Sequence, residues 1–430
     1  YGSITTDGAI TGWAASAGGI KSSLVLWADT NGDGGAITLD TSTAITTNGG
    51  GVWLGGGGGS TSWTPYIGGT DMTVGTGRAR HTASSGDLIG VHLPSGASIT
   101  TSGGNVVMRG QADTTVTATA ANGMAGVVIN GTIAAGTGSI TVDGLTQGPG
   151  YNVQPVNGSG TLTSSNTTDS AISITGSMSG TNPTSGNGTQ LTSAAIGVNF
   201  GGTIEATGTS GGGISINGTA SSSYSQQWGV ALNSSNILAK AGPIAITGVM
   251  GTGTAAAGTK TAIDIGAGTV GWKTGTNVTS SSSAITFTGD TFNFSGAGTV
   301  QSSGILNIKP ATAGNFIGIG RSDAGWLLLP LTYFSQNFKN GFSQIVIGGD
   351  TPGAIYVGDS TVQTLTYSDP LMLKSPGSVV VNSNLSLTGT VGQSAHLVIW
   401  ADADGSGSGR VIHDGAIATN GGHFYVGGGS

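Results

Sequence analysis

Short apolar groups recur along the whole chain, separated by polar turns that are rich in glycine. Residues 126–144, 197–218 and 229–248 each contain three such groups within about 20 residues. Apolar and small polar residues alternate inside a group, as in Ile140–Val142. This alternation predicts strands whose side chains point in turn inward and outward. Three strands in each repeat predict a coil with three faces.

A second pattern marks the expected corners of these coils. Ile45–Gly50, Ile99–Gly104 and Ile417–Gly422 are each a strand candidate that ends in paired glycines, and an apolar strand candidate follows each copy. Glycine adopts positive φ angles at little cost, so paired glycines let the chain turn sharply between two faces.

The opening of the chain returns near its end. Residues 24–57 are repeated as residues 397–429, and Trp27 corresponds to Trp400 at a distance of about 373 residues. This correspondence predicts one tandem period with an overlap of roughly 55 residues, taken from a longer array.

Composition supports an all-β chain. Glycine accounts for 83 of 430 residues and only 7% are charged, so good helix formers other than alanine are scarce. A mean hydropathy of +0.14 and the low charge argue against disorder. Because each coil of a solenoid contacts only its neighbours, residues 1–430 are expected to form one continuous β-solenoid with irregular loop insertions.

Two segments depart from the pattern. Residues 326–342 are the most aromatic stretch, Pro330 ends any strand there, and three phenylalanines spaced by four residues allow a short helical turn. We predict an insertion packed on the flank of the solenoid; an exposed aromatic contact patch is the alternative. The polar residues 146–169 are expected to lie outside the core.

Charge limits the possible partners. The net charge is −7 and no basic run occurs, which argues against nucleic acid and anionic membranes as partners. No stretch approaches about 20 apolar residues, so we expect no membrane-spanning helix.

One loop resembles a calcium-binding loop. Asp29, Asn31 and Asp33 alternate and Gly34 follows, as in the first six positions of an EF-hand loop, and Asp40 stands at the twelfth position. These four residues are the predicted metal ligands. The alternative is a turn of Asp, Asn and Gly between strands, favoured because the copy at residues 402–413 ends in His413. No obligatory cofactor is expected.

The residue types that commonly serve in catalysis form no recognisable motif in this sequence. Polysaccharide-active enzymes need clustered carboxylates, but Glu205 is the single glutamate and the five histidines share no spacing. Threonine pairs such as Thr286 and Thr288 do not recur at the constant interval that an ice-binding face requires. We therefore expect a protein that is not an enzyme.

Residues 24–37, 341–357 and 364–389 resemble repeats of giant bacterial exoproteins of the filamentous-haemagglutinin type, which are secreted by two-partner or autotransporter routes. The resemblance implies a right-handed parallel β-helix at the cell surface or outside the cell. It implies a structural segment of an adhesin-type filament or stalk, with roles in adhesion, cell contact or biofilm. The expected partners are coils of the same or an adjacent chain, stacked end to end, and cell-surface glycans.

Two other functions remain open at this point. The chain could be a β-helical polysaccharide-active enzyme or a carbohydrate-binding module. It could also be the protomer of a self-assembling fibre, because an open solenoid end can dock head to tail in a contact that does not close.

Overall fold

A computed structural model describes residues 2–12, 21–82, 88–113, 123–147, 152–168, 170–179, 194–221, 224, 226–251, 260–274, 277–278, 282–295, 297–359, 363–389 and 395–429. These residues form two compact units. Unit 1 consists of Tyr1–Gly242 and Val249–Lys260, and unit 2 consists of Pro243–Gly248 and Thr261–Ser430.

Unit 1 has three parallel sheets, which we call its first, second and third faces. The first face contains β1 (Ile4–Thr6), β4 (Ile37–Leu39), β9 (Leu88–Leu93), β12 (Gly123–Ile129), β15 (Asn152–Val153), β16 (Val156–Gly158), β19 (Ala194–Phe200) and β22 (Gln226–Leu232). The second face contains β2 (Ala9–Thr11), β5 (Ala44–Thr46), β10 (Ser98–Thr100), β13 (Thr132–Ala134), β17 (Thr161–Ser164), β20 (Thr203–Ala206) and β23 (Asn236–Ala239). The third face contains β3 (Leu24–Ala28), β6 (Val52–Trp63), β11 (Val106–Asp113), β14 (Ile140–Gln147), β18 (Ile172–Met178) and β21 (Ile214–Thr219).

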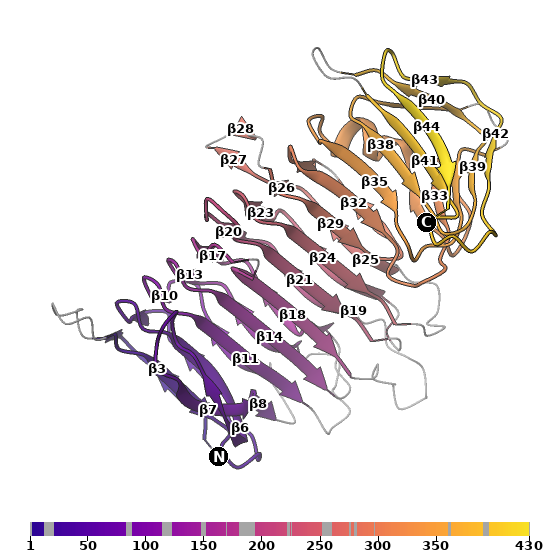
Figure 1. Ribbon diagram of the computed structural model, residues 1–430. Helices are drawn as coiled ribbons and strands as arrows, with labels where there is room; N and C mark the ends of the chain where they lie inside the picture. The colour runs from indigo at the N-terminus through magenta and orange to yellow at the C-terminus, as the bar shows by residue number, and fades with distance from the viewer. Residues whose placement is uncertain are drawn as a thin grey trace, which may run out of the picture. The chain divides into compact units, whose positions relative to one another are not determined.

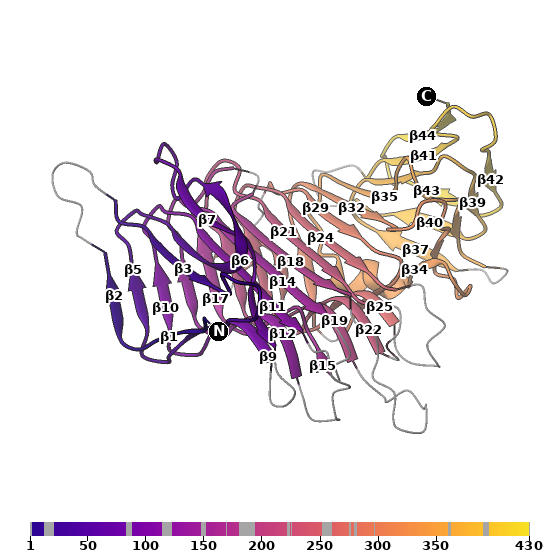
Figure 2. The ribbon, with the colours of Figure 1, turned by 90° about the horizontal axis from the view of Figure 1, so that it is seen from below.

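The chain visits these faces in a fixed order, so β1, β2 and β3 are followed by β4, β5 and β6 on the same three faces. Figure 1 shows β11, β14, β18 and β21 side by side, and Figure 2 shows β2, β5 and β10. Like residues stack, because Ile99 pairs with Ile45 on one side and with Ile133 on the other. The predicted parallel β-helix is confirmed.

The coils differ in length from the predicted repeat of about 20 residues. Stacked partners are 34 residues apart for Arg109 and Asp143, 42 apart for Asn157 and Asn199, and 21 apart for Thr286 and Asn307. The polar connections belong to the coils and lengthen them. Of residues 146–169, residues 148–151 and 169 lie outside the described residues. The others contribute β15, β16 and β17, and the side chains of Val153, Val156 and Leu162 are buried in the core.

The glycine corners have the expected backbone and a second constraint. The first glycine of each pair has a positive φ, 100° at Gly49 and 130° at Gly103. The second glycine is needed for space, because a Cβ at Gly50 would overlap the backbone of Ser22 and one at Gly104 would overlap the backbone of Gly50. Each corner therefore requires both glycines, for different reasons.

The third face of unit 1 carries a further row of glycines, which we call the glycine seam. The seam residues lie at matching positions of successive strands and are Gly110, Gly144, Gly176 and Gly218. Each faces the backbone of the first face. A Cβ at Gly144 would lie 2.6 Å from the carbonyl carbon of Pro155, and one at Gly176 would lie 2.7 Å from that of Gly197. The two sheets meet here backbone to backbone.

The seam divides the interior of unit 1. The main core between the three faces includes Val142 and Ile174, which are 1% and 0% exposed. Beyond the seam lies a second apolar cluster. Its third-face members Ala112, Met178 and Ala220 lie two positions after seam glycines, where alternation returns the side chain to the interior. This outer compartment contains Leu88, Ala112, Met124, Val153, Met178, Ala195, Ala220 and Tyr224.

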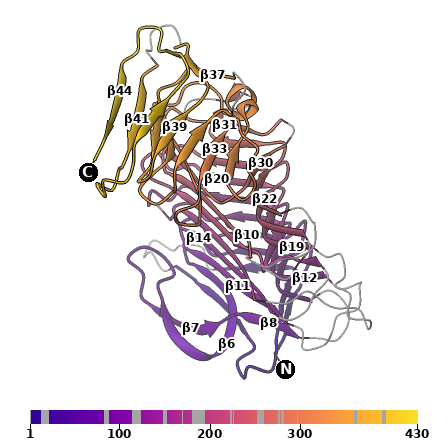
Figure 3. The same cartoon turned by 90° about the vertical axis from the view of Figure 1, so that its right-hand side faces the viewer.

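Strand β6 continues beyond its sheet as a hairpin. It turns into β7 (Met72–Gly77), which runs antiparallel to it, and β8 (Ala79–Thr82) then pairs with β11 (Figure 3). Ion pairs fasten this excursion to the outer surface of the third face. Arg78 donates to Asp143 at 2.8 Å, and Arg80 pairs with Asp113.

Unit 2 has one long parallel sheet, its third face, with β24 (Ile244–Val249), β29 (Ile285–Thr288), β32 (Ile305–Lys309), β35 (Gln344–Gly348), β38 (Leu371–Lys374), β41 (Leu397–Ala401) and β44 (Phe424–Gly428). Four shorter groups of parallel strands complete the coils. They are β25 (Lys260–Ile265) with β30 (Phe292–Phe294); β26 (Thr269–Gly271) with β31 (Thr299–Gln301); β33 (Ile317–Ile319), β34 (Leu327–Leu329), β36 (Ile355–Val357), β39 (Val379–Val381) and β42 (Val411–His413); and β37 (Thr364–Tyr367), β40 (Asn384–Leu387) and β43 (Ile417–Ala418). A short antiparallel pair is formed by β27 (Lys273–Thr274) and β28 (Asn277–Val278).

The aromatic segment 326–342 supplies part of a coil of unit 2. It contains β34 and a π-helical turn, η1 (Tyr333–Asn337), which contacts both β31 and β37. Phe334, Phe338 and Phe342 are 3%, 2% and 0% exposed. The predicted helical turn is present. The turn takes the place of a strand in the coil wall, and these three rings enter the core, where we had expected an insertion on the flank.

Candidate functional site

The calcium-like loop is a tight turn after β3. Asp29 is 4% exposed and has a φ of 50°, and its Oδ1 accepts a hydrogen bond from the backbone N–H of Gly34 at 2.7 Å. Asn31 Nδ2 donates to Asp33 Oδ2 at 2.9 Å. The structure thus places three of the four predicted ligands in one turn, with oxygens already engaged in hydrogen bonds.

Asp40, the fourth predicted ligand, serves a different turn. It lies beyond β4, at the other end of that strand from the loop. Its Oδ1 accepts from the backbone N–H of Ser42 at 3.1 Å and from the hydroxyl of Thr41 at 3.3 Å. The bonds from Ser42 are the main reason that the pKa of Asp40 is lowered.

Within the described ranges, no three carboxylate, imidazole or thiol groups come together as a metal site. Calcium binding at Asp29, Asn31, Asp33 and Asp40 stays a prediction. It implies that 1 mM calcium raises the urea midpoint of unfolding relative to EDTA, because a ligand that binds the folded state stabilises it. The substitution Asp33→Asn should abolish that shift, whereas Asp71→Asn on the β6–β7 hairpin should preserve it. Identical unfolding curves in calcium and EDTA would remove the metal site.

The repeated segments reproduce the same corner in atomic detail. The indole N–H of Trp27 donates to the carbonyl oxygen of Gly57 at 2.8 Å, and that of Trp400 donates to Gly429 at 2.9 Å. Asp402 has a φ of 53°, and its Oδ1 accepts from the N–H of Gly407 at 2.8 Å, as Asp29 does from Gly34. The conserved contacts in the two copies are those of a structural joint.

Glu205 and the histidines, the other candidate groups for catalysis, lie in different surroundings. Glu205 lies on β20, and its register partners Thr163 and Leu238 carry no charge. The rings of His396 and His423 stack at 5.0 Å between centroids, and burial lowers the pKa of His92. Neither histidine arrangement is joined to a carboxylate by an ion pair within the described residues.

A buried carboxylate holds the aromatic segment to the next coil. Asp369 is 1% exposed and accepts backbone hydrogen bonds from Gly341 at 2.9 Å and from Phe342 at 2.8 Å. The hydroxyl of Tyr367 donates to it at 3.4 Å. Burial raises the pKa of Asp369 above its ordinary value of 3.8, against the opposing effect of the two backbone bonds.

This pKa shift predicts a pH dependence of stability. A raised pKa means that the folded state binds the proton of Asp369 more tightly than the unfolded state does. The contribution of Asp369 is therefore greatest below pH 3.8 and is lost as the pH rises through the folded-state pKa. Relative to an Asp369→Asn variant, the parent should lose stability between pH 3.5 and pH 7, as measured by urea midpoints. If the stability of the parent relative to the variant stayed constant or rose between pH 3.5 and pH 7, this assignment would be wrong.

An aromatic cluster covers the outer surface around β33. Trp326 lies across Gly318, and its ring is 4.8 Å from that of Tyr356 and 5.3 Å from that of Phe316. The guanidinium of Arg321 lies 5.3 Å from the centre of Trp326. Phe316 is 40% exposed. Trp326, which belongs to segment 326–342, is thus half-buried at the surface, although the phenylalanines of that segment are buried.

Arg321 is held by its own neighbours. Its Nε donates to Asp323 at 2.6 Å and its Nη1 donates to the carbonyl oxygen of Gly358 at 2.7 Å. The hydrogen bond from Arg321 is the main reason that the pKa of Asp323 is lowered. The guanidinium of Arg321 therefore links two loops through hydrogen bonds.

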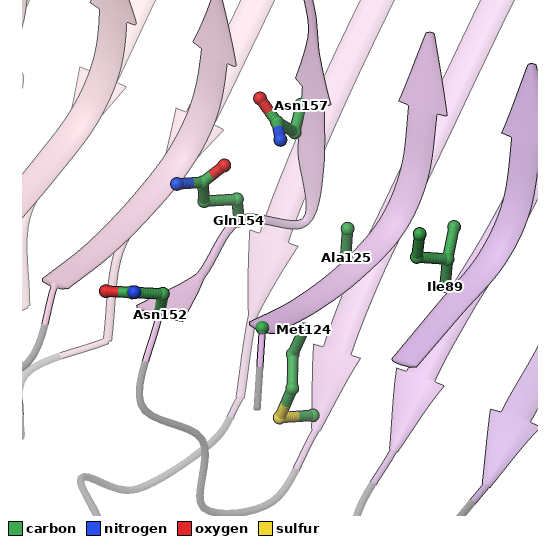
Figure 4. Close-up of a pocket in the computed structure, with 7 residues that line it drawn as sticks. Ile89, Met124, Ala125, Asn152, Gln154 and Asn157 are labelled. Carbon is green, nitrogen blue, oxygen red and sulfur yellow. The ribbon is translucent and has the colours of Figure 1, made fainter. Parts of the chain in front are cut away.

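Unit 1 has a small pocket of about 170 Å³ on the first face, lined by amide and apolar groups (Figure 4). Asn152, Gln154 and Asn157 lie on one side, and Ile89 and Ala125 on the neighbouring strands. The oxygens of Gln154 and Asn157 accept hydrogen bonds from Asn199 at 3.3 and 3.4 Å. The pocket contains no titratable group and offers hydrogen bonding without acid–base chemistry.

Comparisons of the chain with protein-family models, curated proteins and solved structures found no match. In the described part of the chain, no helix has the length and apolar character needed to cross a membrane.

Proposed function

We propose that this chain is a structural segment of an extracellular bacterial filament or stalk of adhesin type, without catalytic activity. One observation carries the proposal. The pair of coils that contains Trp27 recurs around Trp400 with the same indole hydrogen bond and the same aspartate-capped turn. Recurrence of a structural joint is typical of tandem arrays.

The packing of the coils supports a load-bearing role. Each strand inside a stack bonds to the coils above and below, and buried residues meet like residues, as Ile172 does with Ile140 and Ile214. In such a stack, deformation breaks rows of hydrogen bonds together. Stacked coils therefore suit a stalk.

Surface labelling of the source cells tests this function. We expect antibodies against the chain to label intact cells, and we expect external protease to remove the label while a cytosolic enzyme stays protected. A strain that lacks the protein should attach less to surfaces or to other cells. Labelling that requires lysis of the cells would contradict the proposal.

The alternative functions make distinct predictions. A filament whose subunits have a mass near 41.7 kDa would support a self-assembling protomer, whereas a mass many times larger would support one giant chain. A polysaccharide-active enzyme would reduce the viscosity of an acidic polysaccharide solution, which the proposed structural role does not.

A further inference from the structure

A groove of about 390 Å³ lies on the outer surface of the third face of unit 2. Its lining comes from β29, β32, β35 and β38, which lie side by side in Figure 1, and from the loop after β35. The side chains in its lining include those of Thr286, Asn307, Lys309, Val346, Asp350 and Lys374. Their strands belong to one unbroken parallel sheet, so the backbone places them firmly.

Gly348 is part of the groove lining and has no side chain. Gly348 pairs with Lys374, and Lys309 directly follows Ile308, which pairs with Ile347. Gly348 has a φ of 98°, and a Cβ there would overlap the carbonyl oxygen of Lys374. Lys309 and Lys374 lie on β32 and β38, the two neighbours of β35, so their backbones stand about 10 Å apart, which is two strand spacings.

Both lysines line the groove, and their charges are incompletely balanced. Lys374 Nζ lies 2.6 Å from Asp350 Oδ1 and 4.5 Å from the centre of the Trp400 ring. The side chain of Asp350 is 71% exposed, so solvent weakens this pair. Lys309 forms no ion pair with a carboxylate in the described part of the chain. The groove thus carries a local positive charge on a chain of net charge −7.

The remaining lining suits a sugar. Thr286 on β29 and Asn307 on β32 provide a hydroxyl and an amide to the groove. The hydrogen bond between them, from Asn307 Nδ2 to Thr286 Oγ1, is long at 3.4 Å. Such groups exchange hydrogen bonds readily with ligand hydroxyls. Val346 adds a small apolar surface. Pockets of this size with a few convergent polar groups commonly bind small ligands.

We propose that this groove binds a saccharide residue that carries one carboxylate, as in a uronic acid. The carboxylate would lie over Gly348 between the ammonium groups of Lys309 and Lys374, and the sugar hydroxyls would meet Thr286 and Asn307. The inference deepens the proposed adhesin function by naming a class of glycan. The net charge of the chain opposes polyanions such as nucleic acid, for which a single net positive charge is insufficient.

Calorimetric titration of the full chain tests the proposal. The probes are a galacturonic acid trisaccharide, the monosaccharide galacturonate and the neutral galactose trisaccharide. We expect the acidic trisaccharide to bind at least ten times more tightly than the neutral one, and we expect added NaCl to weaken it. Lys309→Gln and Lys374→Gln should each reduce affinity about tenfold, because each removes a charge-assisted hydrogen bond. Lys339→Gln is the matched control, since its ammonium donates to Gln336 on the η1 segment.

Substitution of Asp350 separates a ligand site from a structural latch. In a binding groove, Asp350 competes with the ligand for Lys374, so Asp350→Asn should strengthen binding of the acidic sugar. If the Lys374–Asp350 pair only held the loop in place, Lys374→Gln and Asp350→Asn would both weaken binding of the acidic sugar. Circular dichroism would verify the fold of each variant.

Equal binding of the acidic and neutral sugars, or no binding at millimolar concentration, would overturn the proposal. The monosaccharide shows how much of the recognition lies at the charged sugar itself. Failure of sugar binding with surface labelling intact would remove this ligand and leave the filament function standing. Labelling that appears only after lysis would remove the filament function, whatever the groove binds in solution.

Discussion

Replacing Gly144 with alanine should lower the free energy of unfolding by about 3 kcal/mol or more, the upper end of overpacking effects. The new methyl group would lie 2.6 Å from the carbonyl carbon of Pro155 and closer still to its oxygen. Backbone atoms cannot rotate away as a flexible side chain can. The first and third faces would therefore have to separate, which would open the outer compartment around Met124 and Val153.

A matched alanine substitution isolates this effect. Like Gly144, Gly377 has a backbone conformation that alanine can adopt. A Cβ at Gly377 would lie 3.4 Å from its nearest neighbour, the backbone nitrogen of Ala354, which is an ordinary contact. Gly377→Ala should change stability by no more than about 0.5 kcal/mol. Urea unfolding followed by circular dichroism compares the two variants. If Gly144→Ala unfolds at the same urea concentration as Gly377→Ala, the seam is not a close backbone contact.

The second large effect concerns Phe338. Its ring makes edge contacts with Phe294 at 5.3 Å and Phe334 at 5.5 Å, and it is 2% exposed. Truncation to alanine removes these contacts and leaves a cavity in the wall formed by η1. We expect Phe338→Ala to reduce the free energy of unfolding by about 3–5 kcal/mol.

Phe316→Ala provides the control for Phe338, because the Phe316 side chain is 40% exposed and its truncation leaves no closed cavity. We expect it to cost less than about 1.5 kcal/mol, the usual scale of an aromatic edge contact. Near-ultraviolet circular dichroism during urea unfolding would report both variants. Equal, small effects would mean that segment 326–342 is a surface patch and not part of the core.

The strand pattern was predictable because a half-buried strand leaves a local record. Ile140 and Val142 are buried and Thr141 lies between them, which the alternation in the sequence already indicated. The corners at Gly49 and Gly103 were predictable for a similar reason, since a positive φ restricts the residue type at one position. Both features depend on a few consecutive residues.

The glycine seam also left a signal in the sequence. The three segments that showed the repeat best begin and end with glycine, and Gly126 and Gly144 bound the first of them. A sequence cannot say whether such a glycine serves a turn or a close approach. Here the backbone is extended, and the requirement for glycine comes from a strand that lies far away in the chain. Contacts between distant segments decide that question.

The aromatic segment and the groove show the same division. The spacing of Phe334 and Phe338 indicated a helical turn, but its place inside the coil wall depends on β31 and β37, which lie on either side of it. Lys309 and Lys374 are remote in sequence and belong to no motif. They line one groove because β32 and β38 both pair with β35, the strand that ends at Gly348.

By itself, the sequence determined that this chain forms stacked parallel coils with glycine corners and a recurring joint at Trp27 and Trp400, because these follow from local alternation and from direct repetition. Tertiary structure alone decided which glycines separate two cores, which aromatic rings are buried and which charged groups share a groove. Those properties depend on the register between coils whose lengths vary, and loop lengths set that register without leaving a local pattern.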